Sequence, residues 1–149
     1  MTPSLQDPAG YLADYARPAY LVLAASLSEA RALGGVRSYL PDGRGVVWTA
    51  PTHAVRARAI DVEPARAPVS TRLSRRAGSD DPIVVWPLWT RAEVAAKLLD
   101  LPVLSWLSWP GLELPERFAE QLALTTLVLP DAATGGITVT CGATIARQA

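Results

Sequence analysis

His53 and Cys141 are the residues most able to act as a base or a nucleophile, and the sequence contains one of each type. A neutral histidine at a helix N-terminus can serve as a general base, and Asp61 or Asp131 could orient it if the fold brought one of them near. One histidine and one cysteine, far apart in the sequence, match no ligand spacing of a metal site. No nucleotide-binding glycine motif is present either. We therefore expect no catalytic residues, no metal and no cofactor, and the sequence favours a non-catalytic protein while leaving enzyme activity open.

Cys141 and Arg147 are spaced as Cys-x5-Arg after an expected strand. This spacing resembles the loop with which cysteine phosphatases and rhodaneses hold an oxyanion, and the resemblance implies a thiolate cradled by backbone amides. Thr144 stands where many such loops have glycine. We therefore expect Cys141 to be a small buried thiol in a strand.

The five tryptophans offer aromatic faces that could stack on a base, a sugar or the side chain of a partner. They all fall at or just beyond expected strand ends: Trp48, Trp86, Trp89, Trp106 and Trp109. Large aromatic residues mostly fill cores, and we expect this of the three that end strands. Trp89 and Trp109 lie beside turns, so they are the better candidates for an exposed binding surface.

Charge is balanced over the whole chain, at 14 basic and 14 acidic residues, but it is not evenly distributed. Six arginines fall between positions 53 and 76, where they could meet phosphate groups or an acidic partner. The residues that we expect to bind a ligand or partner combine these arginines, the two turn tryptophans and polar residues after strands: Trp89, Trp109, Ser26, Thr52, His53, Arg72, Arg75 and Arg76.

The elements that must position these residues follow from apolar runs and turn signals. The spacing predicts a short helix over Pro8–Ala16 and a buried strand over Ala19–Ala25. Ser26-x-x-Glu29 has the spacing of a capping box and predicts a helix. Val36–Leu40 and Val46–Thr49 flank a proline-glycine turn and predict a hairpin.

In the second half, Pro82–Trp86 and Pro102–Trp106 read as buried strands, and Thr90-x-x-Glu93 reads as a second capping box that opens a helix ending near Leu99. Thr125–Leu129 and Ile137–Cys141 predict the last two strands, which pair across a glycine turn with Ile137–Cys141 at an edge. That edge strand could also pair with a second copy of the chain.

The stretch from Val46 to Val62 is echoed by the stretch from Val84 to Leu101, each an apolar run closed by tryptophan and followed by an alanine-rich segment. A repeated strand-turn-helix unit predicts an α/β fold with a mainly parallel sheet of about five to six strands, helices on both faces and one or two antiparallel hairpins at the edges. We expect one domain over residues 1–149, with a flexible arginine-rich segment at about 63–81. Ligands of such sheets bind at the carboxyl ends of the strands.

These observations favour a non-catalytic binding or regulatory protein of a bacterial cytoplasm that acts through a protein partner or self-association. A single cysteine excludes an intramolecular disulfide, and the longest apolar runs are too short to cross a membrane. One alternative is a small-molecule or nucleotide-binding α/β domain with its ligand at the strand ends. Another is a DNA-associated protein that uses the segment Arg66–Arg76.

Overall fold

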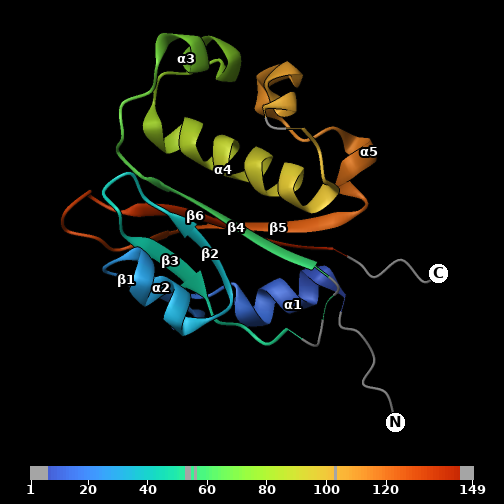
Figure 1. The fold of residues 1–149 in the computed structure, drawn as a ribbon. Coiled ribbons are helices and arrows are strands. Elements are labelled where there is room, and N and C mark those ends of the chain that lie inside the picture. The colour runs from blue at the N-terminus through green and yellow to red at the C-terminus, as the bar shows by residue number, and fades with distance from the viewer. Residues whose placement is uncertain (1–6, 53–54, 56, 103, 145–149) are drawn as a thin grey trace.

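The strands of this protein form two small antiparallel sheets (Figure 1). The computed structural model describes residues 7–52, 55, 57–102 and 104–144, and in this part of the chain six strands divide into two sheets of three. The predicted α/β fold with a mainly parallel sheet of five to six strands is therefore wrong. Short turns join β2 to β3 and β5 to β6, and such turns pair strands antiparallel, whereas parallel neighbours need longer crossovers.

The first sheet has the order β1-β3-β2. β2 (Val36–Tyr39) and β3 (Gly45–Trp48) form the predicted hairpin, which is thereby confirmed. β1 (Leu21–Ala24), preceded by the 3-10 turn η1 (Pro18–Tyr20), pairs with the other side of β3.

The first capping box is confirmed at the start of α2 (Leu27–Leu33). The Ser26 hydroxyl accepts a hydrogen bond from the Glu29 amide at 3.2 Å, and the Glu29 carboxylate accepts one from the Ala25 amide at 3.0 Å. The helix ends at Gly34, which has a positive φ of 69° that favours glycine.

The second sheet has the order β4-β6-β5, so the last strand in sequence lies in the middle. β4 (Ala57–Pro64) and β5 (Leu122–Leu129) each pair over eight residues with β6 (Ile137–Thr144). The predicted pairing of the last two strands is confirmed, but the prediction that Ile137–Cys141 forms an edge is wrong. The helix that the repeated unit predicts after Trp48 is also wrong, because β4 occupies that part of the chain and pairs with the other side of β6.

A single long helix, α4 (Pro82–Leu99), replaces the strand predicted at Pro82–Trp86. The Asp81 carboxylate caps it by accepting from the Ile83 amide at 3.0 Å, and Pro82 occupies the first turn. A short apolar run cannot by periodicity be told from a buried helix segment, which explains the error. The apparent repeat is therefore one strand, Val46–Trp48, and one helix.

Thr90 is not a helix cap but a buried residue in the middle of α4. The Thr90 hydroxyl lies 2.9 Å from the Trp86 carbonyl, to which it can donate, and 2.8 Å from the Thr140 hydroxyl. The Thr140 hydroxyl in turn lies 2.8 Å from the Thr126 hydroxyl. This chain of hydroxyls joins α4 to β6 and β5. The position of Gly142 in β6 has no room for a Cβ, because Val94 and Leu98 of α4 pack directly against it.

Short helical segments pack on the far side of α4 and form a second layer (Figure 1). They are α3 (Thr71–Ala77), the 3-10 turns η2 (Ser105–Ser108) and η3 (Pro110–Leu112), and α5 (Glu116–Ala119). The strand predicted at Pro102–Trp106 is therefore wrong. α3 lies within the segment 63–81.

The sheet β4-β6-β5 separates two apolar cores. α4 and the helical layer cover one face, and α1 (Pro8–Tyr15), a helix that the sequence predicted, packs against β5 and β6 on the other. Trp48 ties the first sheet to this second core, because its indole nitrogen donates to the Tyr15 carbonyl at 2.9 Å. Arg58 of β4 donates to the Tyr11 hydroxyl at 3.2 Å and lies over the Trp48 ring.

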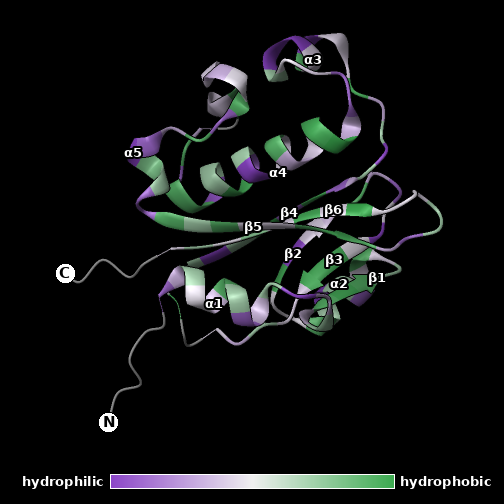
Figure 2. Cartoon of the chain, turned by 180° about the vertical axis from the view of Figure 1, so that it is seen from behind, coloured by the Kyte–Doolittle hydropathy of each residue, from purple (hydrophilic) through white to green (hydrophobic). Residues whose placement is uncertain are grey.

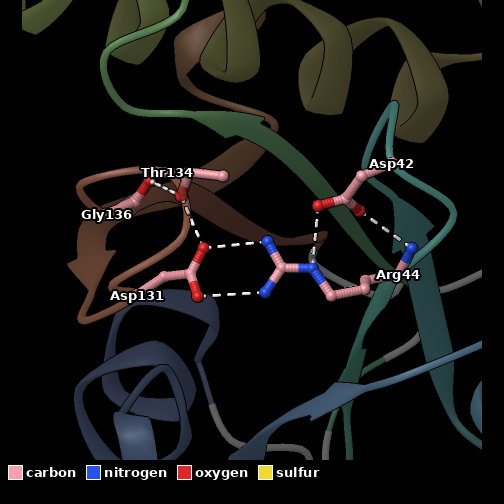
Figure 3. A network of polar contacts seen from close by, with 5 residues as sticks. All are labelled: Asp42, Arg44, Asp131, Thr134 and Gly136. Carbon is pink, nitrogen blue, oxygen red and sulfur yellow. Dashed lines mark hydrogen bonds and ion pairs between the residues drawn. The ribbon is translucent and has the colours of Figure 1, made fainter.

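An ion pair joins the β2–β3 turn to the β5–β6 turn (Figure 3). The Arg44 guanidinium donates two parallel hydrogen bonds to the Asp131 carboxylate, at 2.9 and 2.8 Å, and a third to Asp42 at 2.8 Å. The Thr134 hydroxyl lies 2.6 Å from the same Asp131 carboxylate. These donors hold the pKa of Asp131 well below its usual range.

Candidate functional site

A cleft of about 300 Å³ opens between α3, α4 and η2. We call it the tryptophan cleft. Its apolar lining consists of Pro68, Leu73, Trp86, Trp89, Leu104 and Leu107. Ser70 and Arg72 supply its polar groups. A mainly apolar concavity with few polar groups is the usual form of a binding site.

The two tryptophans of the cleft are fixed by contacts behind them. Trp86 and Trp89 are three residues apart on α4 and therefore project from the same side of the helix. The Trp86 indole nitrogen donates to the Ala67 carbonyl at 2.8 Å. The Trp89 ring meets Trp86 and Trp106 edge to face, with centroids 6.0 and 4.5 Å apart. Because these contacts set the ring positions, the cleft is formed before any ligand arrives.

The basic side of the cleft comes from α3. Ser70 caps this helix by accepting from the Leu73 amide at 3.2 Å, and Leu73 is buried in the core below. Arg72 lines the cleft, while Arg75 and Arg76 lie exposed in the last turn of the same helix. Three exposed guanidinium groups on one short helix make this side of the cleft attractive to anions.

The residues singled out by sequence lie in different places. Trp89 and Arg72 meet in the tryptophan cleft. The prediction that Trp109 is exposed is wrong, because Trp109 is buried in the core under the helical layer, at the base of a second, more polar hollow with Glu113 and Arg117. Ser26 is occupied as the cap of α2.

Thr52 lies exposed after β3 and lines neither hollow, and His53 lies outside the described residues. Sequence reasoning missed Leu104 and Leu107, which line the cleft from a segment taken for a strand and the turn after it. The spacing of Trp86 and Trp89 was the available signal, since it places both on one helix face.

Cys141 shows no sign of a nucleophile. It lies fully buried in β6, and burial raises the pKa of its thiol to about 12, so the thiolate is absent at neutral pH. Arg147, the other half of the Cys-x5-Arg motif, lies outside the described residues.

Three carboxylates, Asp61, Glu63 and Glu93, lie where α4 covers β4. Burial raises the pKa of Asp61 to about 6 and that of Glu63 to about 7, and it also raises the pKa of Glu93. The Lys97 ammonium donates to Asp61 Oδ1 at 3.3 Å and to the Ile60 carbonyl at 2.9 Å. Asp61 Oδ2 is buried and has no hydrogen-bond partner among the described residues. Within that part of the chain, no three or more histidine, cysteine or acidic residues are arranged so that they could hold a metal ion.

No protein-family model, curated protein or solved structure matches this chain. Among the described helices, none is both long and apolar enough to cross a membrane.

Proposed function

We propose that this protein is a non-catalytic binding protein whose tryptophan cleft receives the apolar side chains of an acidic peptide segment in a partner protein. The observation that carries the proposal is the combination of a preformed apolar cleft with arginines on one side. Aromatic anchors that are held in place before binding, such as Trp89, are typical of the energetic centre of protein interfaces.

The size of the cleft supports a peptide. About 300 Å³ is at the lower end of small-molecule sites, and it suits one or two large side chains. The cleft is open to solvent, since Leu104 in its wall is 45% exposed and Arg72 is exposed. An apolar surface continues along α4, because Ile83 is 74% exposed and lies three residues before Trp86.

The positive charge of the α3 arginines favours a partner segment with acidic residues. Arg72 lines the cleft, and Arg75 and Arg76 follow on the same helix, so carboxylates that flank the apolar anchor would form charge-assisted hydrogen bonds with them. We therefore expect sequences in which an aromatic residue or leucine lies between aspartates and glutamates. Such flanking charges mainly raise the rate of association and the specificity.

Selection of a random peptide library displayed on phage against the immobilised protein tests this proposal. We expect enriched peptides to carry an apolar anchor with acidic neighbours, and their affinity is measured by calorimetry. Leu104→Asp should weaken binding by about tenfold or more, because it places a carboxylate in the apolar wall. Leu104 has a positive φ of 64°, which aspartate tolerates better than leucine, so this variant should fold.

Leu27→Asp is the matched control, since Leu27 is 44% exposed and opens α2 on the first sheet. Arg72→Glu should weaken binding as Leu104→Asp does, whereas Arg31→Glu on α2 should not. Peptides without an apolar anchor, or peptides whose affinity is the same for Leu104→Asp and Leu27→Asp, would show that the cleft is not the binding site.

A small aromatic anion is the second candidate ligand, because the volume and the single lining arginine also fit it. Anilinonaphthalene sulfonate is a suitable probe. Saturable binding of this probe that Leu104→Asp abolishes, in the absence of any selected peptide, would favour a small-molecule site. The DNA-binding alternative through Arg66–Arg76 stays a prediction.

A further inference from the structure

β5 has one side that pairs with β6 and one side that no strand occupies in the described part of the chain. Viewed from behind, β5 runs in the open between α4 and α1 (Figure 2). Its middle residues, 123–127, are only half-buried, and Val128 is 58% exposed. The second side of β5 therefore presents a row of free backbone amides and carbonyls, which is a template for another strand.

This edge lacks the features that usually prevent such pairing. The eight residues of β5, Leu122–Leu129, contain no charge, no proline and no glycine, and they pair with β6 in unbroken register. The opposite edge of the sheet is different, because β4 carries Arg58, Asp61 and Glu63 and lies against β2. β1, an edge of the first sheet, is only four residues long. Charges and short edges are the common protections, so β5 is the unprotected edge.

We propose that two copies of this protein pair through β5 in antiparallel orientation and form one six-stranded sheet. A two-fold axis perpendicular to the sheet relates such strands, and it keeps the α4 face of both copies on the same side. Opposing side chains must lie on the same face of the sheet, so one residue of β5 must lie opposite its own copy, with the axis between the two. The longest pairings, over residues 122–128 or 123–129, place the axis at Thr125 or Thr126. With the axis at Thr125, the opposing pairs are Leu122 with Val128, Ala123 with Leu127, and Leu124 with Thr126.

Self-complementarity is what favours a second copy as the occupant. In both registers every opposing residue is uncharged, and apolar residues on the α4 face meet one another or threonine. With the axis at Thr126, Val128 faces Leu124 of the other copy, so the most exposed side chain of β5 becomes covered. The net charge of zero also means that the copies do not repel each other at long range.

The dimer does not depend on the proposed peptide binding, but it has a consequence for it. Because the axis keeps α4 of both copies on one side of the sheet, both tryptophan clefts lie on that side. Two clefts on one side allow a partner with two acidic segments to bind both at once.

Light scattering coupled to size exclusion, from low to high micromolar concentration, tests the proposal on the full chain. We expect the wild-type protein to reach the dimer mass. Val128→Lys should raise the dimer dissociation constant by about tenfold or more, because a buried charge at a strand edge opposes pairing. Leu23→Lys is the control, since Leu23 is 37% exposed on the other candidate edge, β1, and this variant should keep the dimer.

Oxidative crosslinking determines the β5–β5 register directly, because it detects a contact that forms and not one that is lost. Thr125→Cys should form an interchain disulfide if the axis passes through residue 125, and Thr126→Cys if it passes through 126, because opposing residues have a suitable Cα separation. Both cysteine variants also carry Cys141→Ala, because Cys141 lies opposite residue 125 in the β5–β6 pairing and could otherwise form an intrachain disulfide with Thr125→Cys. A wild-type monomer at all concentrations, a dimer insensitive to Val128→Lys, or no crosslink for either cysteine would overturn the proposal.

Discussion

We expect this protein to lose stability as the pH rises from about 4 to about 8, and Asp61→Asn to remove much of that loss. Asp61 is 13% exposed beneath α4, and burial outweighs the ammonium of Lys97, which lies 3.3 Å away, so its pKa rises from 3.8 to about 6. A carboxyl group whose pKa is higher in the folded protein destabilises the fold when it ionises. The protonated Asp61 carboxyl contributes stability that is fully present below about pH 4 and is lost as the pH rises through about 6.

The magnitude follows from the two pKa values. A rise from 3.8 to about 6 corresponds to ~3 kcal/mol of folding free energy between about pH 4 and about pH 8. Glu63 and Glu93 act in the same direction, but solvent weakens their effect because both are less buried. The Lys97 ammonium lowers the pKa of Asp61, and the value of about 6 already includes this effect. Asp131 titrates below this pH range, since its pKa is held low by Arg44.

Urea denaturation followed by tryptophan fluorescence, from about pH 4 to about pH 8, measures the effect. The wild-type protein should lose free energy of unfolding as the pH rises, and Asp61→Asn should reduce that loss by about 1–3 kcal/mol. Lys97→Met should increase the loss, because it removes the cation that favours the Asp61 carboxylate. A wild-type protein more stable at pH 8 than at pH 5, or equal slopes for wild type and Asp61→Asn, would refute this account.

Two substitutions and one labelling reaction test the packing around β6. Gly142→Ala should lower the free energy of unfolding by about 1–3 kcal/mol in urea denaturation, since its Cβ would overlap side chains of α4. A loss below experimental error would show that α4 can move away. Thr140→Val should cost about 1–3 kcal/mol in the same assay, because Thr90 and Thr126 lose a buried partner. Cys141 should react with a thiol reagent only at the rate of unfolding, measured by absorbance, and fast labelling of the native protein would contradict its burial.

Sequence alone predicted the elements whose signals are local. The Ser26 capping box and the β2–β3 hairpin depend on contacts between residues close in sequence, and both are present. Val46–Trp48 and Val84–Trp86 have the same three residues, Val-Val-Trp, yet the first run belongs to a strand and the second to a helix. Only the surroundings decide between them, because neither run is long enough to show a period.

The sheet order was beyond the sequence for a similar reason. Alternation of apolar residues shows that Ile137–Cys141 is a strand, but not that β4 pairs with its second side. The tryptophan cleft depends on this long-range arrangement as well. Trp89 and Arg72 were singled out separately, and their meeting across α3 and α4 could not be deduced from their spacing.

The place of β6 between β4 and β5 also has a consequence during synthesis on the ribosome. β4 and β5 are translated first, but neither has its neighbour in the sheet until β6 has left the exit tunnel. The nascent chain therefore exposes two strand edges and the apolar underside of α4 for the whole time needed to translate the last hairpin. Chaperones that bind nascent chains should engage this segment, and slow codons before β6 should increase aggregation.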